Sequence, residues 1–208
     1  MKVIAINGSP RSKSNTGLVL EAMAVELARE GIETELIQVG NQLIHGCTAC
    51  GACKTPAMRC VFHDQDMVAQ VADKIDGAQG LILGCPTYYA GIPGTMKSFL
   101  DRLFYPQSSR FRYKVATGVS VVRRTGGLDV VHQLQNYLGL AMTVTPPSQY
   151  WTTVYAGAPG NALEDGEGMQ TVRRNAQSMA WLMKMIDATK ESIPLPPEET
   201  RVTTSFIR

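Results

Sequence analysis

The sequence lacks the features that mark a membrane, secreted or nucleic-acid-binding protein. Its longest apolar stretches, such as "GLILGCPTYYAGI", fall far short of the roughly 20 residues of a membrane-spanning helix. Twenty Lys and Arg against 18 Asp and Glu leave a net charge of +2, too mild for the dense basic patch that binds nucleic acid or anionic lipid. No charged, apolar leader precedes "MKVIAING". We therefore expect a cytoplasmic protein with no nucleic-acid or membrane partner.

Two nucleotide-binding motifs are also missing. The chain has neither a Walker glycine loop ending in Gly-Lys-Ser/Thr nor a Gly-x-Gly-x-x-Gly dinucleotide turn. His45, His63 and His132 have no motif partner, so we expect none of them to act as a general base.

The composition is that of an ordinary globular domain, with 44% hydrophobic and 18% charged residues. We expect one domain over residues 1–189, followed by an extended proline-rich tail over residues 190–208.

The apolar periodicity alternates between strand and helix. Short apolar runs predict strands over 2–6, 80–86, 114–122 and 141–145, and an alternating pattern predicts a strand over 33–39. Helical spacing predicts helices over 16–31, 64–76, 94–104, 127–139 and 166–189. This alternation indicates an α/β fold whose parallel sheet is covered by helices on both faces. Ligands of such sheets bind beyond the carboxyl ends of the strands, so the loops there are the candidate sites.

The loop "NGSPRSKSNTG" (7–17) joins the first strand to the first helix. It offers the backbone N–H groups of a helix N-terminus, which bind anions. It also offers polar side chains at Ser9, Arg11, Ser12, Ser14, Asn15 and Thr16. A helix cap needs only one such residue, so we favour a site for a mononucleotide phosphate over a simple cap.

Two further loops have unusual compositions. "CPTYYAGIPG" (85–94) places two tyrosines between prolines and glycines, which suits either a planar ligand or a rigid turn that covers the core. "SVVRRTGG" (120–127) ends the fourth strand with an arginine pair and two glycines, which suits either close approach to a ligand or a solvated basic turn. The 146–165 segment is a long loop, typical of a functional rather than an idle connection.

Four of the five cysteines lie in "HGCTACGACKTPAMRC" (45–60). The spacing of Cys47, Cys50, Cys53 and Cys60 allows a [4Fe–4S] cluster, a tetrahedral zinc, a reversible disulfide or a loop without ligand. Zinc ranks below iron–sulfur because zinc sites more often use two separated Cys-x-x-Cys pairs. Cys85 precedes a proline at a strand end, and we interpret it as a small buried residue.

The order of these motifs resembles the flavodoxin-like NAD(P)H-dependent FMN reductase superfamily. The segments that carry the resemblance are "GSPRSKSNT", "CPTYYAGIPGTMKSFLDR" and "SVVRRTGG". "CTACGACKTPAMRCVFHDQDM" is similar to the cysteine motif of its iron–sulfur flavoprotein branch, and "EDGEGMQTVRRNAQSMAWLMK" to that branch's last helix. The resemblance covers roughly residues 1–188.

The resemblance implies a flavodoxin-like three-layer sandwich with strand order 2-1-3-4-5 that binds FMN. The residues implied to hold the phosphate are Ser9, Arg11, Ser14, Asn15 and Thr16. Those implied to surround the ring are Pro86, Thr87, Tyr88, Tyr89, Ala90, Gly91, Ser120, Arg123, Gly126 and Gly127. The cysteines implied to hold a [4Fe–4S] cluster are Cys47, Cys50, Cys53 and Cys60. A homodimer or homotetramer with the flavin near a subunit interface is also implied.

An FMN-dependent oxidoreductase is the function that these expectations favour. Electrons would pass from NAD(P)H, or from a ferredoxin-like donor, to a small acceptor such as a quinone or a nitro compound. The flavin carries this chemistry, so no side chain is assigned as acid or base. An open face above the ring, covered by Trp151 and Tyr155, would receive donor and acceptor in turn. The alternative is an electron carrier with a ferredoxin-like protein partner and no organic substrate.

Overall fold

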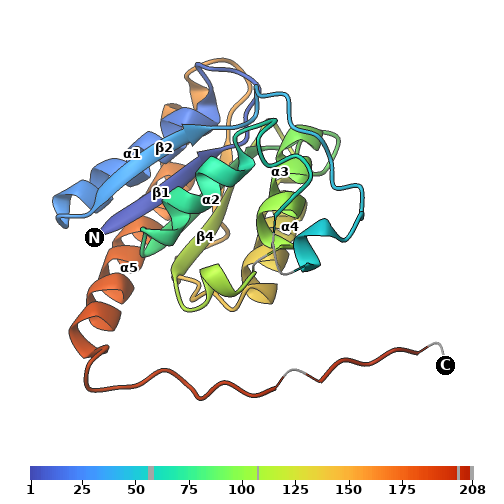
Figure 1. The fold of residues 1–208 in the computed structure, drawn as a ribbon. Coiled ribbons are helices and arrows are strands. Elements are labelled where there is room, and N and C mark those ends of the chain that lie inside the picture. The colour runs from blue at the N-terminus through green and yellow to red at the C-terminus, as the bar shows by residue number, and fades with distance from the viewer. Residues whose placement is uncertain (56–58, 107, 201, 207–208) are drawn as a thin grey trace.

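The protein is described here from a computed structural model, which places all residues except 56–58, 107, 201 and 207–208. A five-stranded sheet forms its centre, in the order β2-β1-β3-β4-β5, with every neighbouring pair parallel (Figure 1). The strands are β1 (Lys2–Asn7), β2 (Glu33–Gln38), β3 (Gly80–Pro86), β4 (Val115–Val122) and β5 (Thr153–Tyr155). The predicted strand order is confirmed.

Helices cover both faces of this sheet (Figure 1). They are α1 (Asn15–Arg29), α2 (Val68–Asp76), α3 (Gly94–Phe104), α4 (Gly127–Leu140) and α5 (Gly166–Thr189), with short 3-10 turns η1 (Ala52–Lys54), η2 (Ser108–Phe111) and η3 (Asn161–Glu164). Successive β1 residues point to opposite faces, so Val3 and Ala5 pack beneath α1 and α5, while Ile4 and Ile6 pack beneath α2, α3 and α4. The predicted three-layer sandwich is confirmed.

The fifth strand lies later in the chain than the sequence predicted. The expected strand over 141–145 makes only an isolated bridge, in which Val144 pairs with Val115 at the start of β4. Pro146 and Pro147 follow and have no N–H to continue the ladder. Pairing resumes at Thr153, inside the segment predicted as a long loop, and places β5 beside the carboxyl half of β4.

The second helix is also shorter than predicted. It begins at Val68 instead of residue 64, and the Asp66 carboxylate accepts a hydrogen bond from the Val68 N–H (3.2 Å). After α5 the described tail residues form an extended chain (Figure 1), and Glu198 in this tail forms an ion pair with Arg112 just before β4 (2.6 Å). Among the described residues, no helix combines the length and apolarity that crossing a bilayer requires.

Candidate functional site

The loop after β1 is fixed by hydrogen bonds to its neighbours. The Ser9 N–H donates to Asn7 Oδ1 (3.0 Å), and the Arg11 N–H donates to Ser9 Oγ (3.3 Å). The Gln38 amide, at the end of β2, donates to the Ser9 carbonyl and accepts from Asn7 Nδ2 (2.8 Å). Ser9 is buried by these contacts, whereas the Arg11 side chain is exposed at the carboxyl edge of the sheet. The loop therefore has one defined shape before any ligand arrives.

The N-terminus of α1 follows this loop directly. Ser14 caps the helix, with its hydroxyl accepting from the Gly17 N–H (3.0 Å). The first-turn N–H groups of a helix have no intrahelical acceptor, which suits an anion. The Asn15 side chain, however, is bound to the loop before α5, through Nδ2 to the Ala158 carbonyl (2.8 Å) and Oδ1 from the Gly160 N–H (2.9 Å). In this structure Asn15 thus offers its backbone N–H to a phosphate, and Thr16 is buried beside it.

The loop after β3 forms a tight reverse turn. Tyr88 and Gly91 exchange two backbone hydrogen bonds (2.9 and 3.0 Å), and the intervening Tyr89 and Ala90 have φ of 48° and 61°. Two successive positive φ values are typical of a type I′ turn and are costly for side chains with a Cβ. Tyr89 is fully exposed at the tip. Pro86 ends the strand, and Thr87 is anchored by its N–H to the Val121 carbonyl (2.8 Å).

The loop after β4 packs against this turn. Gly126 has φ +88°, and a Cβ built there would lie 3.4 Å from Ala90 Cα and 3.5 Å from Thr87 Cγ2. Glycine is therefore favoured by the backbone conformation, while a Cβ at this position would make only ordinary van der Waals contacts with the neighbouring loop. Thr87 Oγ1 is buried without a hydrogen-bond partner among the described residues. The structure thus brings together two loops that the sequence separates by more than thirty residues.

Two other residues assigned to the ring site, Ser120 and Arg123, contact β5 and the loop that follows it. Ser120 is fully buried, with its hydroxyl 2.9 Å from Thr153 Oγ1, so its side chain supports the sheet. Arg123 is exposed, and its Cγ would lie 3.5 Å from a Cβ at Gly157, which places it against the loop after β5. Whether either contacts a ligand stays a prediction.

A cavity of about 310 Å³ opens beside the glycines of the β4 loop. Gly126 and Gly127 form one wall, and the aromatic side chains of Tyr150, Trp151 and Tyr155 form another. The Tyr150 and Trp151 rings meet edge to face with centroids 4.7 Å apart. This volume lies at the lower end of the range for small-molecule sites. The predicted cover residues Trp151 and Tyr155 therefore border a space next to the ring loops.

The four clustered cysteines surround one small cavity of about 20 Å³. Cys47 and Cys50 are exposed, Cys53 and Cys60 are partly buried, and all are free thiols. Among the residues that the structure describes, no three His, Cys, Asp or Glu side chains are grouped closely enough to hold a metal ion. The Ala52 N–H and the Thr48 hydroxyl lower the pKa of the Cys50 thiol, which favours the thiolate that a metal requires.

Cys85 differs from these four. It is completely buried in β3, and this burial raises the pKa of its thiol. A neutral buried thiol is inert, in agreement with its interpretation as a core residue.

Arg102 on α3 was missed by sequence reasoning. Its side chain is 2% exposed and forms a buried ion pair with Asp66. The sequence carries one signal, because Arg102 lies next to the buried Leu103 and three residues after the buried Phe99 on a helix. A charged residue at such a position indicates a buried partner.

The residues at the carboxyl edge fit a flavin mononucleotide. They supply helix N–H groups and an exposed guanidinium for a phosphate, and a turn with exposed aromatic side chains for a planar ring. The cysteine loop fits an iron–sulfur cluster in the number and kind of its donors, since four thiols face one cavity.

Comparisons with known proteins agree with this geometry. Residues 1–157 match the family model described as NADPH-dependent FMN reductase. An iron-sulfur flavoprotein from Methanocaldococcus jannaschii is 32% identical over 195 residues, which cover 89% of this chain and 99% of that protein. An iron-sulfur flavoprotein from Methanosarcina thermophila is 28% identical, with 92% and 100% covered.

More distant proteins share the fold. The crystal structure of a flavodoxin, WrbA-like protein from Agrobacterium tumefaciens has a TM-score of 0.60 at 17% identity, with 88% of this chain and 97% of that chain covered. The sequence matches span most of the chain and include both the carboxyl-edge loops and the cysteine loop. This chain therefore belongs to the NADPH-dependent FMN reductase family, in its iron–sulfur flavoprotein branch, and is an FMN-dependent oxidoreductase.

Proposed function

We propose that this chain transfers electrons from NAD(P)H, or from a ferredoxin-like donor, to a small acceptor such as a quinone or a nitro compound. The observation that carries the proposal is the contact between the loops after β3 and β4 at the carboxyl edge of the sheet, next to a cavity of about 310 Å³ that the β4 loop lines together with three aromatic side chains. Bound FMN supplies hydride and single-electron transfer.

The chain's own residues bind FMN and orient its ring. The N-terminal turn of α1 and Arg11 hold the phosphate, because N–H groups and a guanidinium complement its charge. The turn over Tyr88–Gly91 and the adjacent Gly126 present backbone groups to the ring edge. Tyr155 and Trp151 limit access of water to the space above it.

We propose further that Cys47, Cys50, Cys53 and Cys60 hold a [4Fe–4S] cluster, which supplies one-electron transfer. The support is that all four thiols border one cavity, and that Cys50 is biased toward the thiolate. Among the described residues the thiols are not grouped closely enough to hold a metal, so binding a cluster requires that they move closer together.

The second candidate is an electron carrier that serves a protein partner and no organic substrate. One observation favours it: Cys47 and Cys50 lie at the surface, where another redox protein can approach them. The two candidates differ in whether NAD(P)H alone supports turnover.

Assembly and location complete the proposal. We expect a homodimer or a homotetramer in the cytoplasm, supported by exposed apolar side chains on α5, Trp181 and Met185, and by the extended tail. Sedimentation of the purified protein as a monomer would contradict the assembly.

The test is anaerobic purification followed by assays of FMN, iron and acid-labile sulfide. We expect one FMN per chain and close to four iron and four sulfide per FMN. Steady NADPH oxidation with menadione supports the enzyme, whereas reduction only by ferredoxin supports the carrier. Arg11→Ala should weaken FMN binding, with Arg112→Ala as a control that removes an exposed arginine just before β4, at the opposite edge of the sheet. Equal affinity of both variants and the wild type would show that the phosphate lies elsewhere.

A further inference from the structure

The cysteine loop is closed at its base by contacts between residues that lie before and after the four cysteines. His45 precedes Cys47, and Phe62 follows Cys60. Their rings stack with centroids 4.2 Å apart and an interplanar angle of 19°. The loop therefore leaves the domain and returns to it at one point.

Arg102 on α3 binds both sides of this base. Its Nη1 donates to the His45 carbonyl (3.2 Å) and its Nη2 donates to the Phe62 carbonyl (3.2 Å). Its guanidinium carbon also lies 5.1 Å from the centre of the Phe62 ring. A planar fork of donors suits this arrangement, because it can reach two carbonyls in fixed directions, which a lysine cannot do.

The positive charge of Arg102 is neutralised by the carboxylate of Asp66. Nη1 also donates to the Asp66 carboxylate, and the two side chains are 2% and 5% exposed. Asp66 in turn accepts from the Val68 N–H at the start of α2. The contacts of Arg102 thus join α3, the start of α2 and both ends of the cysteine loop.

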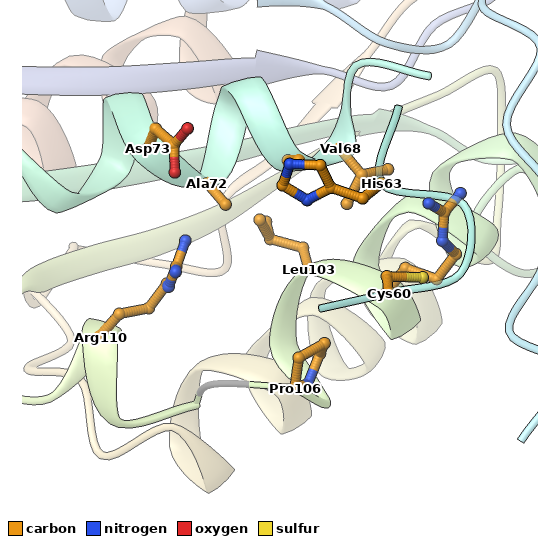
Figure 2. Close-up of a pocket in the computed structure, with 10 residues that line it drawn as sticks. Cys60, His63, Val68, Ala72, Asp73, Leu103, Pro106 and Arg110 are labelled. Atoms are coloured by element: carbon orange, nitrogen blue, oxygen red, sulfur yellow. The ribbon is translucent and has the colours of Figure 1, made fainter. Parts of the chain in front are cut away.

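Arg102 also faces the cysteines. Together with Cys60 it lines both the small cavity that the four thiols surround and a second cavity of about 180 Å³ behind the loop. Figure 2 shows this second cavity between Cys60 and His63 on the loop side and Leu103 and Pro106 on the side of α3. Arg102 Nε has no hydrogen-bond partner among the described residues.

We propose that Arg102 is the positioning residue of the cysteine site: it closes the base of the loop so that four thiols face one cavity, and it places a positive charge beside the sulfur of Cys60. The inference rests on the proposed function, because it concerns the loop that would hold the cluster. Closing the loop before metal arrives removes part of the entropy cost of gathering four ligands. A buried positive charge beside a cluster favours its reduced, more negative state.

The test sets aside the single variant Arg102→Met and compares three others that treat the buried charge differently. Arg102→Met alone leaves Asp66 buried without its partner and risks misfolding. The double variant Arg102→Met with Asp66→Asn removes both charges and keeps an oxygen that can accept from the Val68 N–H. Arg102→Lys keeps the charge but loses the fork, and Asp66→Asn alone is the matched control. FMN content and the thermal unfolding midpoint verify the fold of each variant.

Two readouts are independent of turnover. In metal-free protein, we expect the double variant to react severalfold faster than wild type with a maleimide at Cys60, as measured by mass spectrometry, with buried Cys85 as the unreactive reference. After reconstitution with ferrous iron and sulfide, we expect less than half the wild-type cluster content and a lower reduction potential for whatever cluster remains. Arg102→Lys keeps the positive charge, so its cluster should have a reduction potential close to that of wild type, whereas its cluster content should stay low because the two carbonyls are no longer bridged.

The outcomes separate the two proposals. If wild type takes up no iron or sulfide, the cluster is refuted, while the maleimide rates still test the closure of the loop. If the double variant matches wild type in labelling rate, cluster content and potential, Arg102 has no positioning role. Loss of cluster content with an unchanged labelling rate and an unchanged potential would also overturn the proposal.

Discussion

Asn15 offers a direct test of where the phosphate binds, because the hydrogen bonds of its neutral side chain can be separated from the effect of a charge introduced at the same position. Its amide donates to the Ala158 carbonyl (2.8 Å), and its oxygen accepts from the N–H groups of Gly160 (2.9 Å) and Ala162 (3.4 Å). Asn15→Ala loses all three bonds. Asn15→Asp keeps the acceptor for two of them and adds a negative charge at the N-terminus of α1.

The two variants should therefore rank in opposite orders for stability and for affinity. With a net value of about 1 kcal/mol for each good hydrogen bond, Asn15→Ala should lose about 2 kcal/mol of the free energy of unfolding. Asn15→Asp should lose about 1 kcal/mol or less, because a carboxylate near a helix N-terminus is favourable by a few tenths. For FMN, like charges about 6 Å apart at an effective dielectric constant of about 40 repel by about 1.4 kcal/mol. Asn15→Asp should thus bind FMN roughly tenfold more weakly than wild type.

The measurements are urea unfolding of the apoprotein and titration of FMN by the quenching of its fluorescence. We expect Asn15→Ala to be the less stable variant and Asn15→Asp the weaker binder. If Asn15→Asp binds FMN as tightly as Asn15→Ala, the phosphate does not lie at the N-terminus of α1. Equal stability of Asn15→Ala and wild type would refute the role of the side chain in holding the 158–162 loop.

Three further predictions concern other parts of the sheet edge and of α4. Ala90→Gly should raise the thermal midpoint by about 2 °C, because it relieves about 1 kcal/mol of strain at φ 61°; a lower midpoint would show that the turn is unstrained. Gly127→Ala should lose about 1–3 kcal/mol of stability in urea unfolding, since its Cβ would lie 2.5 Å from Thr153 Cγ2; unchanged stability would mean that the start of α4 and β5 separate easily. Burial and the hydrogen bond to Asp101 raise the pKa of Tyr137 to about 12. The neutral phenol therefore stabilises the fold below pH 10, and this contribution is lost as the pH rises toward 12. Over that interval the stability of Tyr137→Phe should decline less steeply than that of wild type. Parallel declines would contradict the raised pKa of Tyr137.

The first four strands were predictable because three are short apolar runs and β2 alternates between apolar and polar residues. The strand order was implied by the family resemblance and not by these patterns. β5 was not predictable, because Thr153–Tyr155 has three residues and only one of them, Val154, is buried. Such a strand is defined by pairing with β4 and not by its own pattern. The segment over 141–145 has the stronger pattern but is stopped by two prolines.

The candidate site was predictable where function depends on loops with distinctive composition. The sequence indicated the glycines and tyrosines beside the strands, but not the bonds of Asn15 to the 158–162 loop or of Arg102 to the base of the cysteine loop. Both contacts join residues far apart in the chain, more than 140 apart for Asn15. Spacing along the sequence carries no information about such partners, whereas it does indicate the four clustered cysteines.

α3 links the two candidate sites as a single rigid spacer. It begins at Gly94, directly after the turn over Tyr88–Gly91, and it carries Arg102 eight residues later, about 12 Å along the helix axis. Because Met96, Phe99 and Leu100 are completely buried against the sheet, the helix cannot bend or slide without disturbing the core. The separation between the flavin loop and the base of the cysteine loop is therefore built into the length of one helix, and evolution can retune either site while the distance between them stays constant.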